Sequence, residues 1–174
     1  QTLLYSEINI FSIIALFTVM FNSSVLGVDT KNKNRLFSCS ACFAAMSCIC
    51  DFLWEMSAGG YLLLSRSAAV LVNTMYFICY ALSFCCWFLY IESISESKIF
   101  KRKKRAYIAF LPLAVLVILL AASVFTGCVF SIDENLNYTR GPLFFMQVVL
   151  SYGYIVAAVI RILYDVIGRK NKLV

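Results

Sequence analysis

Five long apolar segments divide the sequence, and short polar segments separate them. Each is about 20 residues long or longer, the length that an α-helix needs to cross the hydrocarbon core of a bilayer. Their residues do not alternate in polarity as the strands of a membrane barrel do, and backbone groups in lipid have to be paired within the segment. The sequence therefore predicts an all-α, polytopic bundle whose helices span residues 3–27, 36–56, 68–91, 106–126 and 143–164.

The composition excludes an ordinary soluble domain. Hydrophobic residues make up 62% of the chain and charged residues 14%, whereas soluble domains average about 45–50% and about 25%. We expect residues 1–174 to form a single membrane domain of a multi-pass protein, with lipid as its surroundings. Because the sequence begins with Gln1 instead of methionine, we expect it to be part of a longer protein.

The distribution of Lys and Arg predicts the orientation, because basic residues concentrate in cytoplasmic loops. Most lie between the first two spans, between spans three and four, or after span five: Lys31, Lys33 and Arg35; Lys98 and Lys101 to Arg105; Arg169, Lys170 and Lys172. Only Arg66 and Arg140 lie in the opposite loops. The N-terminus is therefore expected outside and the C-terminus in the cytoplasm. We interpret the basic run at 98–105 as a topology anchor on anionic lipid, and we expect no nucleic-acid partner.

The eight cysteines suggest a metal or redox site at first sight. Cys39 and Cys42 form a C-x-x-C, and Cys85 and Cys86 are adjacent. Metal binding and redox chemistry need accessible thiolates in a polar setting, whereas seven of the eight lie in apolar segments of a chain without histidine. We expect them to act as small hydrophobic residues, with no metal, cofactor or disulfide in spans two and three.

Polar residues inside the predicted spans are costly in lipid and therefore point to a site. Several lie near the predicted outer ends of spans two, three and five, and together with the loop residue Arg140 they form the candidate ligand site: Asp51, Trp54, Asn73, Tyr76, Arg140, Gln147 and Tyr152. One interpretation is an outward-facing pocket for an unidentified small molecule, beneath the polar loop 131–140. The other is a set of hydrogen bonds between helices.

Arg140 has two expected partners. Its planar guanidinium would neutralise a ligand carboxylate or phosphate, or else Asp51 or Glu55; Arg66 is a second candidate for those acids. Gly141 and Pro142 are expected to start the fifth helix, since proline fits a first helical turn. At the other end, the helix is expected either to stop at Gly168 or to continue towards a cytoplasmic module.

Several stretches carry a family resemblance, among them "SRSAAVLVNTMYFICYALSFCCWFLYIES" (Ser65–Ser93), "TGCVFSIDENLNYTRGPLFFMQ" (Thr126–Gln147) and "SYGYI" (Ser151–Ile155). They resemble the membrane sensory regions that precede GGDEF diguanylate cyclase domains in clostridial-type bacteria, and the related input regions of histidine kinases. The resemblance implies a multi-pass sensor in a bacterial cell membrane that controls cyclic di-GMP synthesis by a cytoplasmic homodimer. The cytoplasmic output domain that it implies is not within residues 1–174. These 174 residues contain no GGDEF sequence and no catalytic signature.

Two other classes of protein, a small transporter and an intramembrane enzyme, fit the sequence less well than a sensory domain. A small transporter would show paired repeats and several helices broken by Gly or Pro, whereas only Pro112 interrupts a span. An intramembrane enzyme would need a nucleophile with a base or a metal set, and the carboxylates here are scattered. Whether the sensory domain belongs to a cyclase or a kinase depends on the sequence that follows Val174.

Overall fold

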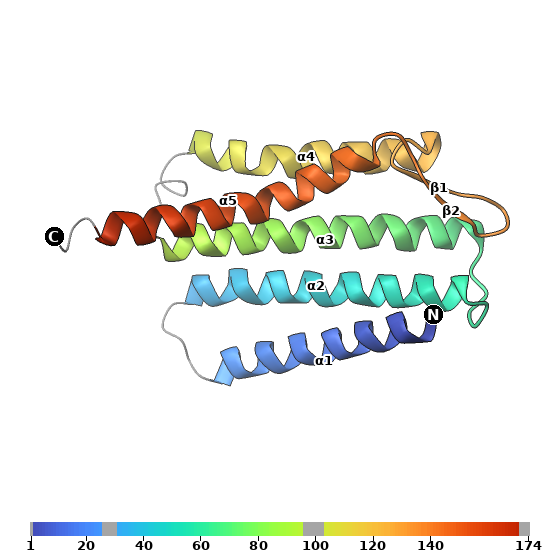
Figure 1. Ribbon diagram of the computed structural model, residues 1–174, viewed down its shortest axis with the longest axis horizontal. Coiled ribbons are helices and arrows are strands. Elements are labelled where there is room, and N and C mark those ends of the chain that lie inside the picture. The colour runs from blue at the N-terminus through green and yellow to red at the C-terminus, as the bar shows by residue number, and fades with distance from the viewer. Residues whose placement is uncertain (1, 26–30, 96–102, 171–174) are drawn as a thin grey trace.

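The computed structural model describes the backbone of residues 2–25, 31–95 and 103–170, and the side chains of residues 7–19, 35–95 and 107–167. Five long helices lie side by side, and a short hairpin connects the last two (Figure 1). The elements are α1 (Thr2–Val25), α2 (Lys31–Ala58), α3 (Arg66–Ile94), α4 (Lys103–Thr126), β1 (Phe130–Ile132), β2 (Tyr138–Arg140) and α5 (Phe144–Lys170). The predicted helical bundle is confirmed.

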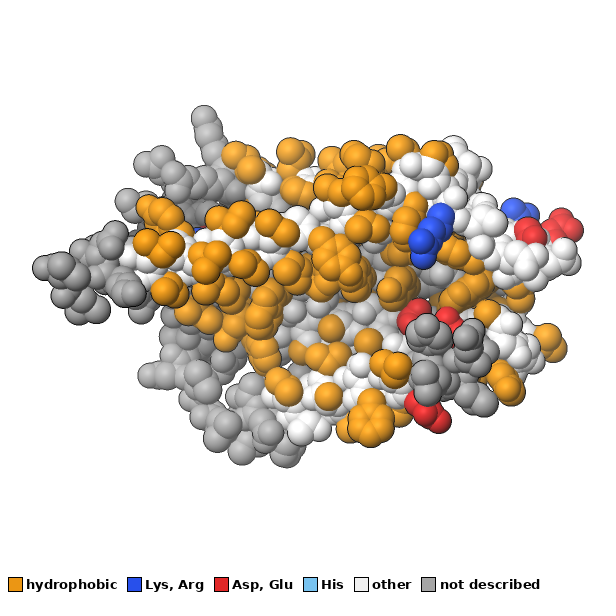
Figure 2. All heavy atoms as spheres, in the orientation of Figure 1, with side chains coloured by type: hydrophobic (Ala, Val, Ile, Leu, Met, Phe, Trp, Pro, Cys, Tyr) orange, Lys and Arg blue, Asp and Glu red, His pale blue; other side chains and the backbone are white. Residues whose placement is uncertain are grey.

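Within the described residues, four helices are long and apolar enough to cross a membrane: Arg35–Ala58, Arg66–Ile94, Tyr107–Thr126 and Phe144–Ile167. In α1 the described side chains contribute a shorter apolar stretch, Glu7–Val19. Among the described side chains, hydrophobic ones cover much of the visible face along the helices (Figure 2). A soluble protein could not expose such a surface, so the bundle is a multi-pass membrane domain.

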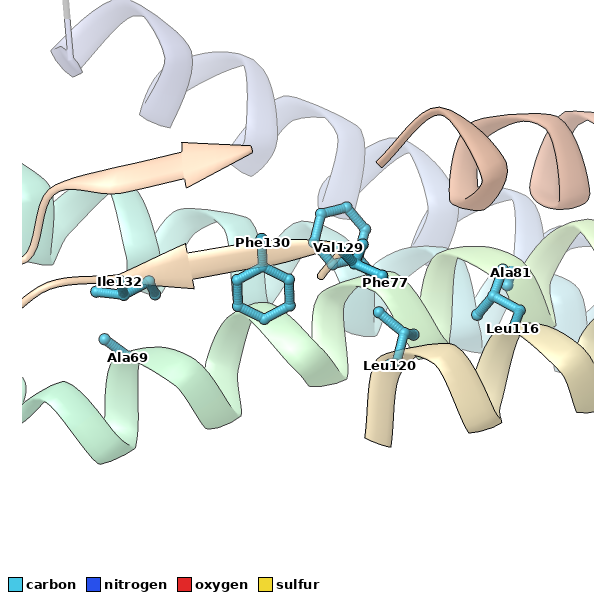
Figure 3. Packing of buried hydrophobic residues seen from close by; sticks show 8 residues of the cluster. All are labelled: Ala69, Phe77, Ala81, Leu116, Leu120, Val129, Phe130 and Ile132. Carbon is cyan, nitrogen blue, oxygen red and sulfur yellow. The ribbon is translucent and has the colours of Figure 1, made fainter. Parts of the chain in front are cut away.

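Helix α3 is the central element, because it packs against α2, α4, α5 and β1, whereas α1 packs against α2. One buried cluster joins α3 and α4 to the hairpin: Ala69, Phe77, Ala81, Leu116, Leu120, Val129, Phe130 and Ile132 (Figure 3). A second cluster joins α3 to α5 towards the other end: Cys85, Phe88, Leu89, Ile91, Tyr154 and Ala158. The first cluster fixes the hairpin against α3 and α4, and the second fixes α5 against α3.

The segment predicted as a polar loop is a β-hairpin. Phe130 pairs with Arg140 and Ile132 with Tyr138, and alternation buries Phe130 and Ile132 while Ser131 faces outwards. The Ser123 hydroxyl of α4 accepts hydrogen bonds from the amides of Val129 and Phe130 at 3.0 and 3.1 Å. The "FSI" run was too short to predict a strand, and it forms one because α3 and α4 provide an apolar surface for it.

Asp133 closes the hairpin turn. Its carboxylate accepts bonds from the side chain of Asn137 at 2.8 Å, from the Asn137 amide at 2.8 Å and from the Asn135 amide at 2.9 Å. These bonds, led by the one from the Asn137 side chain, hold the pKa of Asp133 below its usual range. The polar residues of this segment therefore build its turn.

The ends of α5 differ from the sequence prediction. Gly141 and Pro142 do not start the helix; they belong to the turn before it, and α5 begins at Phe144. At the other end α5 continues through Gly168 to Lys170. Apart from Arg35, the basic residues that predict the cytoplasmic side lie outside the described side chains.

Candidate functional site

All seven predicted site residues lie in the part of the bundle nearer the hairpin, on α2, α3, β2 and α5. Four of them lie together with Glu55, Tyr80 and Tyr138. We call this group the hairpin-end cluster: Asp51, Trp54, Glu55, Tyr76, Tyr80, Tyr138 and Tyr152. The Trp54 and Tyr138 ring centroids are 6.1 Å apart, and those of Tyr76 and Tyr80 are 5.8 Å apart in a stacked arrangement. Trp54, Tyr76 and Tyr138 all pack against the buried cluster that joins α3 and α4 to the hairpin.

The hydroxyls of Tyr80 and Tyr152 join α3 to α5 within this cluster. The Tyr80 hydroxyl donates to that of Tyr152 at 2.8 Å, and both rings contact Phe84, with centroid separations of 4.4 and 5.6 Å. Tyr76, Tyr80 and Phe84 follow each other at i, i+4 and i+8, so they share one face of α3. Sequence reasoning singled out Tyr76 and Tyr152 and missed the bond through Tyr80.

The two acids of the cluster have no cationic partner among the described residues. Asp51 accepts a hydrogen bond from the Asn9 side chain of α1 at 2.7 Å, and both Asp51 and Glu55 are half-buried. Neither expected arginine pairs with them. Arg66 donates to the Ile132 carbonyl at 2.9 Å and holds the hairpin to α3, while the exposed Arg140 guanidinium lies 4.8 Å from the centre of the Phe144 ring.

Asn73 and Gln147 belong to a different surface. Asn73 lies between Ala69 and Phe77 on the face of α3 that packs against α4 and β1, and it donates to the Ala69 carbonyl at 3.0 Å. Gln147 is 3% exposed and donates weakly to the Ser151 hydroxyl at 3.5 Å. The Gln147 carbonyl oxygen has no partner within the described residues. Both side chains are therefore interior, which fits a role in packing between helices.

A separate cavity of about 210 Å³ opens at the hairpin end between α3, α4 and β1. Its wall includes Arg66, Val70, Ser123, Thr126 and Ser131. None of the seven predicted site residues lines it. The predicted site and this cavity are two different places on the bundle.

A charged network joins α3 to α5 at the end opposite the hairpin. Arg161 of α5 lies 3.3 Å from Asp165 and 3.7 Å from Glu92 of α3, and it donates to the Ser95 carbonyl at 3.3 Å. Glu92 is 4% exposed, and its second carboxylate oxygen has no partner in the described part of the chain. Arg161 and Asp165 are an i, i+4 pair on α5, whereas no local spacing in the sequence links either of them to Glu92.

The tyrosine at position 154 has a structural role. Pro112 interrupts the hydrogen bonding of α4, and the Tyr154 hydroxyl of α5 bonds to α4 next to that point. It accepts from the Leu113 amide at 3.1 Å and donates to the Ala109 carbonyl at 2.8 Å. This side chain therefore fastens α5 to the weakest part of α4.

All eight cysteines are free thiols in the structure. Within the described side chains, no group of three or more Cys, Asp or Glu residues is placed to hold a metal ion. The hairpin-end cluster combines two carboxylates on α2 with aromatic rings from α2, α3, β2 and α5. It contains no nucleophile paired with a base.

Comparison with known proteins gives one match. A family model described as the N-terminal 7TM region of histidine kinase covers residues 8–173. No curated protein matches the chain, and no solved structure matches it. The matched range contains most of α1, all of α2 to α5 and the hairpin.

Proposed function

Because the chain belongs to the family of N-terminal membrane regions of histidine kinases, we propose that it is the signal-sensing input domain of such a kinase. The match over residues 8–173 is the observation that carries this proposal. It favours the kinase alternative over the diguanylate cyclase, for which the comparisons offer no support. The input domain binds its signal and passes a change of helix arrangement to a cytoplasmic kinase.

We place the hairpin end outside and the C-terminal end of α5 in the cytoplasm. Lys and Arg residues support this orientation, because they concentrate in the segments at the opposite end from the hairpin. In this arrangement the hairpin-end cluster is reached from outside, and α5 runs from the cluster towards the kinase.

Site-specific labelling tests the orientation. A single cysteine replacing Glu134 in the hairpin turn should react with a membrane-impermeant maleimide on intact cells, whereas a cysteine replacing Lys103 should react only after permeabilisation. Both variants are made in a background from which the eight native cysteines have been removed. Labelling of position 103 on intact cells would place the hairpin in the cytoplasm and reverse the proposal.

Helix α5 is the element that carries the signal in this proposal. Its Tyr152 is bonded to α3 at the hairpin end, and its Arg161 contacts α3 at the other end. A ligand that loosens or tightens the contact at Tyr152 changes the position of α5 relative to α3. The contacts of Arg161 with α3 then have to rearrange. A full reversal between two states needs a differential affinity of about 5.5 kcal/mol, which several convergent polar and aromatic contacts can supply.

Autophosphorylation of the full-length parent kinase in cells measures this function. Tyr152→Phe removes only the hydroxyl that bonds to Tyr80, and Asp51→Asn removes only a charge. Each should change the ratio of stimulated to unstimulated phosphorylation by about 5-fold or more, the usual range of coupling between sites. Glu134→Gln removes an exposed charge from the hairpin and serves as the control. If both site variants respond as the parent does while reaching the membrane at equal levels, the cluster is structural.

A further inference from the structure

We propose that the hairpin-end cluster binds an organic cation, an alkylated or quaternary ammonium compound. This inference rests on the proposed function and gives that site its ligand class. It differs from the expectation based on Arg140, which pointed to a carboxylate or phosphate.

The first observation is the uncompensated negative charge. Asp51 and Glu55 are four residues apart on α2, so they lie on one face, and each is half-buried. Neither forms an ion pair within the described part of the chain. The one polar partner recorded for Asp51, the Asn9 amide group, is neutral. Two carboxylates near lipid without a counter-charge attract a cation, because charge at this depth is costly unless it is paired.

The second observation is the aromatic surface beside these acids. Trp54 lies between them in sequence on the same side of α2, and its ring is 6.1 Å from that of Tyr138. Tyr76 of α3 packs against the same buried cluster as Trp54 and Tyr138. Burial raises the pKa of Tyr138 to about 12, so its ring stays a neutral phenol. Ammonium groups are held by the faces of Trp and Tyr rings, with Trp the strongest.

The third observation concerns Arg66 and Arg140, which could have paired with the acids or attracted an anionic ligand. The Arg66 Nε–H is bonded to the hairpin backbone. The exposed Arg140 guanidinium lies over Phe144, 4.8 Å from the ring centre, and within the described residues it forms no ion pair with either acid. The acids and the aromatic rings therefore define the character of the cluster, and the chemistry that matches both is an organic cation.

The chain contains its own reporter for this ligand. Its two tryptophans are Trp54, in the cluster, and Trp87, which packs with Phe37 and Tyr90 in a separate aromatic group. A Trp87→Phe variant leaves Trp54 as the single tryptophan. Purified into nanodiscs of phosphatidylglycerol, which has no ammonium headgroup, it is titrated with choline and with tetramethylammonium. The neutral carbon analogue of choline, 3,3-dimethylbutanol, is the matched control ligand, and acetate and phosphate test for an anion site.

We expect a saturable change in Trp54 emission with one or both cations, at a dissociation constant of about 1 mM or tighter. The neutral analogue should bind about tenfold more weakly or worse, since it lacks the charge that the rings and acids hold. Asp51→Asn should weaken cation binding by about tenfold, while Glu134→Gln, on the exposed turn, should change it by less than about twofold because its charge is screened by solvent. Arg140→Gln should leave cation binding intact.

A saturable response to acetate or phosphate that Arg140→Gln removes would overturn the proposal in favour of an anion site. Equal responses to choline and its neutral analogue, or no response to either cation, would also overturn it. Nanodiscs of phosphatidylcholine separate the sources of the cation: an emission shift already present there identifies a lipid headgroup as the occupant. Kinase output that depends on Asp51 without any cation binding would leave the proposed function in place and remove only the ligand class.

Discussion

Replacing Gly141 with alanine should destabilise the domain by about 3 kcal/mol, near the upper end of the cost of overpacking. A Cβ at this position would overlap the carbonyl oxygens of Gly127 and Cys128, which are backbone atoms and cannot move aside as a side chain can. The Gly141 amide also donates to the Val129 carbonyl at 2.8 Å, and the Leu143 amide donates to the Cys128 carbonyl at 2.8 Å. The chain therefore crosses its own backbone here before α5 begins.

Thermal unfolding of the purified domain in nanodiscs measures this effect. Gly153 provides the matched control, because a Cβ added there meets no atom within 4 Å. Gly153→Ala should leave the midpoint unchanged or raise it slightly, since alanine favours a helix by about 0.5–1 kcal/mol over glycine. If the Gly141→Ala and Gly153→Ala variants unfold at the same temperature, the backbone does not approach Gly141 as closely as described here.

Replacing Tyr154 with phenylalanine should cost about 1–3 kcal/mol, because it removes the partner of two backbone groups in an apolar setting. The hydroxyl bonds to the Leu113 amide and to the Ala109 carbonyl next to Pro112. Phenylalanine keeps the ring, whose centroid is 5.9 Å from that of Phe88, so the change isolates the hydroxyl. In lipid no water replaces the lost bonds.

Tyr152→Phe is the matched control for this change. It removes a hydroxyl from the same helix, but that side chain is 48% exposed and its partner is another hydroxyl, so the expected cost is about 1 kcal/mol or less. The two variants are compared by thermal midpoint under the same conditions. Equal midpoints would contradict the role assigned to the Tyr154 hydroxyl in holding α4 and α5 together.

The sequence alone determined the class of the protein and the positions of its helices. Whether a segment can leave water depends on the transfer free energy of its own residues, so the composition of each segment is enough to predict its helix. The boundaries of 36–56, 68–91 and 106–126 fall inside or at the ends of α2, α3 and α4 for the same reason. The acids Asp51 and Glu55 near the end of α2 were also visible as residues that lipid disfavours.

Which face of each helix meets which neighbour was decided only by the tertiary structure. In a soluble protein the contrast between apolar and polar positions marks the buried face, but in a membrane both lipid and core are apolar, so that contrast is lost. Asn73 and Tyr76 looked equivalent in sequence, yet Asn73 faces the interior with Ala69 and Phe77, while Tyr76 joins the hairpin-end cluster. Gly141, followed by Pro142, likewise suggested a helix start in the sequence. Only the structure shows that the backbone at Gly127 and Cys128 lies against Gly141 and leaves no room for a side chain there.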